Sequence, residues 1–144
     1  MGLVHRGAGP SFPYAGAPLS VLSGELPFAC AELVVPAHFR GPIPHVHDTF
    51  DEAIYVVEGT IMAGTGWDPA SEAPAGSMLS ATHGTRHFFS NPFDTPARLL
   101  GIWSPGATGL GFMRAIGAAL TETGPPDPDL MRDLYESHGS HLQP

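Results

Sequence analysis

The sequence predicts an all-β domain, a sandwich or barrel of short strands, that ends in a short helical tail. Glycine (18 residues) and proline (16 residues) make up nearly a quarter of the 144 positions, while 42% of the residues are apolar. This combination is typical of a turn-rich β domain and not of a disordered chain. From about residue 19 to 104 short apolar segments alternate with turn residues, and after Pro105 the apolar spacing becomes helical. The length fits one domain with its own core.

The strongest strand candidate covers residues 52–57, where Ile, Tyr and two Val residues precede a Glu58-Gly59 turn. Residues 61–65 then return as its hairpin partner. Short apolar segments bounded by turn residues at this spacing predict a sandwich or barrel. The strand candidates in chain order are residues 28–35, 52–57, 61–65, 77–80, 86–90 and 97–103.

The C-terminal tail is predicted to contain two helices. Residues 110–120 place apolar side chains at helical spacing. A second helix is predicted to begin at Asp127, which suits the N-cap, with Pro128 at the first helical position. Gly139 suits the end of this helix. We expect the tail to pack outside the barrel.

The chain is predicted to form one domain with an N-terminal extension. Residues 1–18 are rich in Gly, Pro and Ala, and we interpret them as an arm that lies over the body or over a neighbouring subunit. A frayed terminus is an equal alternative. Residues 19–144 form the single domain, with the barrel at about 19–104 and the helical tail at about 105–144. We expect a homodimer, because an exposed strand edge invites pairing with a second copy.

Charge and composition exclude several classes of partner. The net charge is −8, and all six basic residues are arginines. An acidic chain without lysine is poorly suited to nucleic acid, whose phosphates require clustered cations. No apolar run approaches the roughly 20 residues of a membrane span, so we expect no membrane partner. The first residues lack the pattern of a secretory signal, and the single Cys30 suits a reducing compartment, which together predict a cytoplasmic location.

Histidine is the residue type whose abundance calls for a chemical explanation, with 8 in the chain. His45 and His47 alternate, so on a strand both imidazoles point to the same face. Glu52 follows at the start of the strongest strand candidate, and His87 lies in a later one. Three histidines and one carboxylate suit a divalent transition metal ion. An isolated pair of alternating histidines more often consists of ordinary surface or core residues than of metal ligands. The flanking residues must therefore distinguish between these two interpretations.

Those flanking residues resemble the two conserved motifs of the cupin superfamily. The stretch from Gly41 to Gly59 resembles the first motif, in which two alternating histidines precede a glutamate and, after six more residues, a glycine. The stretch from Gly76 to Asn91 resembles the second motif, in which a glycine precedes a histidine and then an asparagine. Thr82 stands where the family usually has proline, and the first glycine lies closer to the first histidine than is usual. Neither departure touches a candidate ligand.

The resemblance implies a double-stranded β-helix, or jelly-roll, cupin barrel over about residues 28–104. It implies that His45, His47, Glu52 and His87 are the metal ligands. The cofactor is then one divalent transition metal ion: Zn, Fe, Mn, Ni or Cu. Four protein ligands on an octahedral ion leave two positions for water, O₂ or substrate, as in a catalytic site and unlike a closed structural one.

The substrate pocket is predicted by strand parity. Counting from Glu52 places Ile54 and Val56 inward, and counting from His87 places Phe89 inward. The alternative is that such residues simply fill a core. An apolar lining without basic side chains favours an apolar or aromatic small molecule over a sugar phosphate. The full set of pocket candidates is His38, Ile54, Val56, Met62, Phe89, Leu100 and Ile102.

Three functions are compatible with these residues. In the first, the chain resembles quercetin-dioxygenase-like cupins, and Glu52 is both a ligand and the acceptor of a proton from a phenolic or enolic substrate. In the second, a Zn²⁺ ion polarises a carbonyl in a non-redox isomerase or aromatic polyketide cyclase of secondary metabolism. In the third, the chain binds a metal and a small molecule without catalysis. We rank the dioxygenase-type enzyme first.

Overall fold

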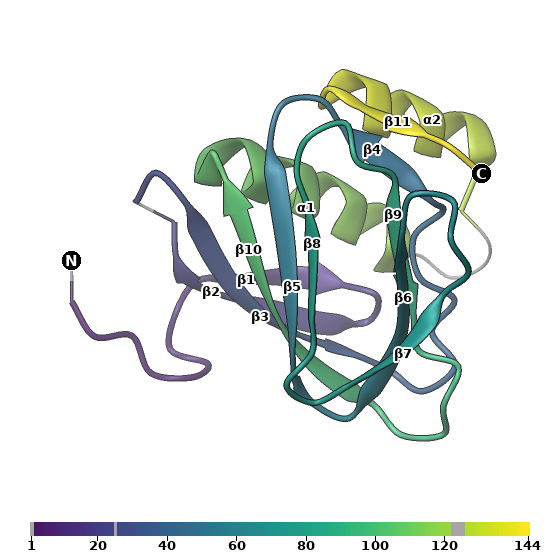
Figure 1. The fold of residues 1–144 in the computed structure, drawn as a ribbon. Coiled ribbons are helices and arrows are strands. Elements are labelled where there is room, and N and C mark those ends of the chain that lie inside the picture. The colour runs from purple at the N-terminus through teal and green to yellow at the C-terminus, as the bar shows by residue number, and fades with distance from the viewer. Residues whose placement is uncertain (1, 25, 122–125) are drawn as a thin grey trace.

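Two antiparallel sheets face each other and form the body of the protein (Figure 1). The structure is a computed structural model that describes residues 2–24, 26–121 and 126–144. Met1 of the predicted arm and residues 122–125 of the predicted tail lie outside the described residues. One sheet has the strand order β1-β2-β3-β10-β5-β8, and the other has the order β11-β4-β9-β6-β7. This arrangement is the predicted jelly-roll, or double-stranded β-helix.

The strands are short and are separated by turns, as the Gly and Pro content predicts. The residue ranges in chain order are β1 (Ser11–Tyr14), β2 (Ala17–Ser23), β3 (Ala29–Val35), β4 (His45–His47), β5 (Asp51–Glu58), β6 (Thr60–Thr65), β7 (Ser71–Pro74), β8 (Met78–Ala81), β9 (His87–Ser90), β10 (Ala97–Ser104), α1 (Gly106–Thr121), α2 (Pro128–Ser137) and β11 (Ser140–Leu142).

All six strand candidates correspond to strands of the structure. The strongest one is β5, which lies between β10 and β8 in the larger sheet. Its buried residues alternate along the strand, because every second side chain faces the second sheet. At Gly59 the backbone has a φ of 80°, which favours glycine, and the chain turns there into β6. The Glu58-Gly59 turn predicted from the sequence is therefore confirmed.

The second half of the predicted N-terminal arm is a β-hairpin that lies over the body of the protein. Residues 11–18 include β1, a turn and the start of β2, and β1 pairs with β2 of the same chain. Tyr14 and Leu19 are fully buried in the core, so apolar side chains hold this hairpin against the rest of the molecule. Residues 2–10 precede the first strand.

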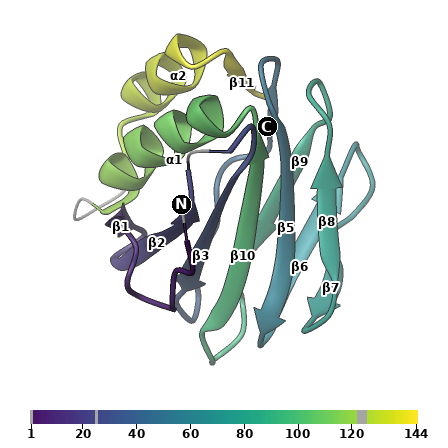
Figure 2. The same ribbon diagram turned by 90° about the vertical axis from the view of Figure 1, so that its left-hand side faces the viewer.

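Helix α1 lies outside the two sheets, as expected, but its apolar face enters the core. Figure 2 shows α1 running along the side where β1, β2 and β3 lie, with α2 and β11 beyond it. Phe112, Met113 and Ile116 are buried at helical spacing on that face. A Cβ atom at Gly109 would lie 2.2 Å from the Cβ of Trp103, so glycine at this position allows the helix to approach β10 closely.

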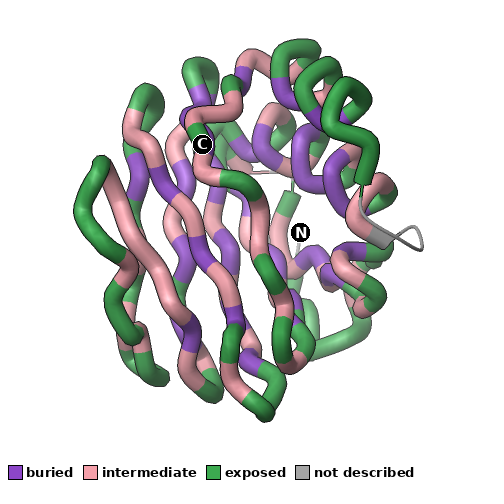
Figure 3. Tube along the Cα trace, turned by 90° about the vertical axis from the view of Figure 1, so that its right-hand side faces the viewer, coloured by how far each residue is buried: buried purple, intermediate pink, exposed green. Residues whose placement is uncertain are grey.

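The second helix and the last strand complete the tail. Asp127 accepts hydrogen bonds from the backbone N–H groups of Asp129 and Leu130, which confirms the predicted N-cap. After α2 the chain reverses at Gly139, where φ is 63°, and β11 pairs with β4. Burial is concentrated between the sheets and on the inner faces of the helices (Figure 3). Among the described residues, no helix is long and apolar enough to span a membrane.

Candidate metal centre

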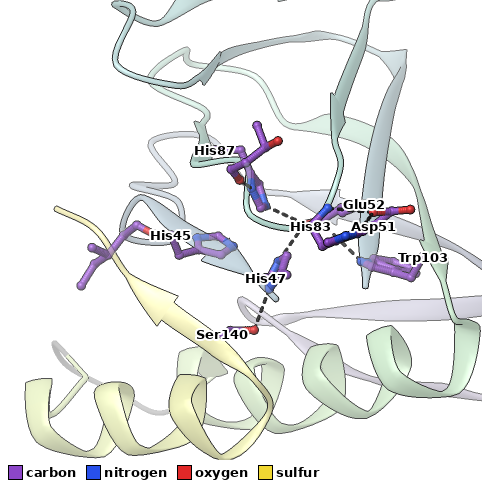
Figure 4. Close-up of polar contacts among 10 residues, drawn as sticks. His45, His47, Asp51, Glu52, His83, His87, Trp103 and Ser140 are labelled. Atoms are coloured by element: carbon purple, nitrogen blue, oxygen red, sulfur yellow. Dashed lines mark hydrogen bonds and ion pairs between the residues drawn. The ribbon is translucent and has the colours of Figure 1, made fainter. Parts of the chain in front are cut away.

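The four predicted ligands come together at one end of the space between the sheets. His45 and His47 are on β4, Glu52 is at the start of β5, and His87 is at the start of β9. His45 and His87 face each other across paired strands. Their candidate ligand atoms all lie within 4.8 Å of one another, and all four residues are buried. Figure 4 shows the side chains converging on this point.

Hydrogen bonds on the outer side of each imidazole fix its orientation. The Nδ1 atom of His45 donates to the Ile43 carbonyl at 2.7 Å, and that of His87 donates to the Thr85 carbonyl at 2.9 Å. A carbonyl oxygen only accepts, so these two rings carry their proton on Nδ1. Each neutral ring then presents an Nε2 lone pair to the centre of the cluster. Orientation of this kind is what metal-binding histidines require.

The third imidazole is oriented by the end of the chain. The Nδ1 atom of His47 lies 2.7 Å from the hydroxyl oxygen of Ser140, and the two atoms share a hydrogen bond (Figure 4). Ser140 is fully buried on β11 and pairs in register with His47. The C-terminal strand therefore takes part in holding the candidate metal centre.

The distances between the imidazole Nε2 atoms and the Glu52 carboxylate indicate whether a metal ion fits between them. The Nε2 atoms of His47 and His87 lie 3.2 Å and 2.9 Å from the same oxygen, Oε2 of Glu52. A lone pair this close to a carboxylate oxygen is repelled unless positive charge lies between them. Protonation of a ring supplies such a charge, and so does a divalent cation held by both groups. Three oriented imidazoles and one carboxylate therefore fit a transition metal ion.

The second carboxylate oxygen of Glu52 is held by an indole. The Trp103 Nε1–H donates to Oε1 of Glu52 at 3.0 Å, and both residues are buried. This bond leaves Oε2 directed at the imidazoles of His47 and His87. Glu52 is thus fixed by a buried neutral donor on one side and faces the metal centre on the other.

Replacement of Trp103 by phenylalanine is expected to lower zinc affinity about tenfold, because Oε1 of Glu52 loses its only indole donor. The measurement is a competition titration with a chelator of known zinc affinity. Trp67→Phe is the matched control, since Trp67 is 76% exposed. Unchanged affinity in the Trp103 variant would contradict the positioning role of this hydrogen bond.

Burial and mutual charge set the protonation of the cluster. Burial, followed by the charges of His87 and His47, lowers the pKa of His45 to about 3. Burial also lowers the pKa of His47. Burial opposes a charge on His87, but the hydrogen bond with Glu52, the Glu52 charge and the hydrogen bond with the Thr85 carbonyl together outweigh burial and raise the pKa of His87. Burial would raise the pKa of Glu52, yet the hydrogen bonds of His47 and His87 hold it below its ordinary value.

The metal-free protein is therefore expected to lose stability in acid. The pKa of His45 is about 3 in the folded protein and 6.5 ordinarily, so its contribution is complete above pH 6.5 and is lost as the pH falls towards 3. From pH 7 to pH 5, His45 alone lowers the free energy of unfolding by about 2 kcal/mol, an effect that the raised pKa of His87 partly opposes. Chemical denaturation at both pH values measures it. Equal unfolding free energies would contradict it, and His38→Ala, an exposed histidine, should leave the difference intact.

An aromatic wall covers the cluster on the side of the tail. The ring of Phe50 stacks on His47 with centroids 4.0 Å apart, and Phe112 of α1 meets the same imidazole edge-on at 4.8 Å. Tyr135 of α2 lies 5.0 Å from His45. The void left between this wall and the ligands measures only about 10 Å³. The tail thus encloses the candidate metal centre.

The structure divides the predicted pocket residues into two groups. Ile54, Val56 and Phe89 are buried and face the space between the sheets. Phe89 borders the small void at the ligands. Ile54 and Val56 line a separate cavity of about 320 Å³ that lies between β5, β6, β7 and β8. A cavity of this size suits a small organic molecule.

The other pocket candidates do not face the space between the sheets. Met62 follows the buried Ile61 on β6, so it lies on the outer face of its sheet. Leu100 and Ile102 alternate with buried neighbours on β10 and also lie on the outer face, where Ile102 and Glu52 both border an open cavity of about 200 Å³. The side chain of His38 is 67% exposed and contacts Asp94.

Several residues at the centre were not identified from the sequence. Trp103 is a strand residue whose inward direction depends on the register of β10. Phe112, Tyr135 and Ser140 belong to the tail, and their contacts with β4 join positions far apart in the chain. No local pattern marks a serine as the partner of a histidine 93 residues away.

The family comparison agrees with this geometry. Residues 31–103, about half of the chain, match the sequence model of the cupin domain. The chain therefore belongs to the cupin superfamily, whose double-stranded β-helix it shares. None of the curated proteins compared with the chain matches it.

Solved structures show the same fold at low sequence identity. An RmlC-like cupin from Shewanella frigidimarina is 16% identical over 76% of this chain and 96% of its own, with a TM-score of 0.66. The polyketide cyclase RemF from Streptomyces resistomycificus is 23% identical over 73% of this chain and 80% of its own, with a TM-score of 0.61. A cupin sugar phosphate isomerase from Silicibacter pomeroyi is 20% identical over 67% and 68%, with a TM-score of 0.56. Sequence identities this low support a shared fold and do not indicate a particular reaction.

Proposed function

We propose that this protein is a metal-dependent cupin enzyme that acts on a small, largely apolar or aromatic substrate with a phenolic or enolic oxygen. The observation that carries the proposal is the buried set of His45, His47, Glu52 and His87, with its imidazoles oriented for ligation. The aromatic rings that surround this set support a substrate of that kind, while the separate cavity of about 320 Å³, which Ile54 lines, has both apolar and polar lining residues. We rank a dioxygenase-type reaction first.

The chain's own residues have distinct tasks in this reaction. A bound redox-active metal ion would supply Lewis acidity towards the substrate oxygen and electrons for O₂. Glu52 presents Oε2 to the centre, and this oxygen is the one that would take the proton of the substrate hydroxyl. Trp103 holds the other oxygen and limits rotation of the carboxylate. The aromatic wall of Phe50, Phe112 and Tyr135 limits the access of bulk water to the ligands.

The test compares metals under identical conditions. The metal-free full chain is loaded separately with Fe²⁺, Mn²⁺, Ni²⁺, Cu²⁺ or Zn²⁺ and supplied with a panel of flavonols, catechols and enols. A dioxygenase consumes O₂ with a redox-active metal and none with Zn²⁺. The metal bound in protein purified from its native host is measured alongside. Zn²⁺ alone in that protein, with no O₂ consumption by any form, would remove the dioxygenase proposal.

A Zn²⁺-dependent cyclase or isomerase is the second candidate. RemF, a polyketide cyclase, shares the fold, and the enclosed aromatic surroundings of the ligands suit an apolar polyketide-like substrate. In this case the Zn²⁺-loaded protein converts its substrate without O₂, and exclusion of air changes nothing. If ligands bind but no form turns over, the third function, metal-dependent binding without catalysis, takes the place of both.

A further inference from the structure

Tyr135 has an unusual position in the aromatic wall. It lies on α2, is only 1% exposed, and packs its ring against His45 and against Phe112 at 5.1 Å. Its hydroxyl is the one buried side-chain oxygen or nitrogen without a hydrogen-bond partner among the described residues. A buried hydroxyl without a partner is costly, and phenylalanine would fill the same space without that cost. The hydroxyl therefore needs a partner that the polypeptide does not provide.

The small void at the ligands is the place for that partner. Tyr135, His45 and Glu52 all border it, and its volume of about 10 Å³ is close to that of one water-sized group. A tyrosine hydroxyl carries a proton that it can donate. A donor without a partner thus borders the same void as two candidate metal ligands.

We propose that the Tyr135 hydroxyl donates a hydrogen bond to the water molecule or substrate oxygen that completes the coordination of the metal ion. The inference rests on the metal centre of the proposed function but not on the reaction carried out there. It gives the C-terminal tail a binding role in addition to its packing role. One helix of the tail would position the exogenous oxygen, and the last strand, through Ser140, positions a ligand.

The first experiment uses fluoride, a water-sized anion that accepts hydrogen bonds, on the Co²⁺-loaded full chain. The visible absorption of Co²⁺ reports both metal loading and fluoride binding. Tyr135→Phe should retain its Co²⁺ stoichiometry and bind fluoride about tenfold more weakly, because one donor to the anion is lost. Tyr55→Phe is the matched control, since Tyr55 lies on the outer face of the sheet and is 36% exposed. Equal fluoride affinity in wild type and Tyr135→Phe would overturn the proposal.

A second measurement separates binding from packing. Without metal, Tyr135→Phe should unfold at the same temperature as wild type or at a higher one, because an unpartnered hydroxyl contributes nothing to the folded state. With Co²⁺ bound, the variant should gain less thermal stability than wild type does. An equal loss of stability in both states would show that the hydroxyl has a partner within the protein, which overturns the inference. Failure of wild type to bind Co²⁺ would refute the metal centre itself, a result distinct from these.

Discussion

Replacement of His87 by alanine is expected to lower the affinity for Zn²⁺ or Co²⁺ by more than about 100-fold, because changes that merely disturb a ligand's surroundings already cost 10- to 100-fold. The His87 imidazole is 1% exposed and approaches Glu52 Oε2 at 2.9 Å, so no water or neighbouring side chain takes its place without rearrangement. Loss of the ring also removes the group opposite His45. Metal content after gel filtration and a chelator competition titration measure the effect.

His83 provides the matched control for this variant. It precedes His87 in the same motif, but its side chain is 66% exposed and contacts Asp51, outside the ligand cluster. His83→Ala should therefore keep its metal. Equal metal content in His87→Ala and wild type would refute the ligand assignment. Equal losses in both histidine variants would show that the effect is not specific to the cluster.

The sequence predicts the ligand set well because the motifs lie at the ends of short strands. Alternation on β4 fixes the common direction of His45 and His47, and alternation on β5 carries from Glu52 to Ile54. Pairing between β4 and β9 then brings His87 into the cluster. These relations follow from strand geometry, so few long-range contacts have to be known in advance.

Strand parity is ambiguous where both faces of a strand are apolar. On β10, Leu99 and Trp103 face inward, while Leu100 and Ile102 face outward between the polar Arg98 and Ser104. The middle of the strand is apolar on both faces, and pairing with β3 and β5, a tertiary contact, fixes the inner one. Because Leu100 and Ile102 were predicted to face inward, Trp103 was not expected to face inward as well. The sequence therefore did not identify the indole that holds Glu52.

The tail shows a second limit of prediction from sequence. Helical spacing and the Asp127 cap predict that α1 and α2 form, but they do not say which surface the helices cover. The answer depends on three glycines of α1, each of which lies too close to a neighbouring strand or side chain for a Cβ atom. Those contacts, and the pairing of β11 with β4, place Phe112 and Tyr135 over the metal centre.

Phe112→Ala is expected to have the largest effect on stability, lowering the free energy of unfolding by about 3–5 kcal/mol. The ring is 3% exposed and contacts His47, Phe50 and Tyr135, so its removal leaves a cavity among rings that cannot easily collapse. The cavity would join the small void at the ligands and let water reach them. Chemical denaturation of the metal-free protein measures the stability, and release of Zn²⁺ to a chelator should become faster.

The control for this variant is a phenylalanine that does not cover the metal centre. Phe28 is 41% exposed, so Phe28→Ala should change the unfolding free energy by less than about 1 kcal/mol and leave zinc release unchanged. If Phe112→Ala does not fold, Phe112→Leu keeps most of the volume and should cost about 1 kcal/mol. Faster zinc release in that milder variant, without a matching loss of stability, would separate the barrier role of the ring from its packing. Zinc release as slow as in wild type from a folded Phe112→Ala protein would mean that the tail does not limit access to the centre.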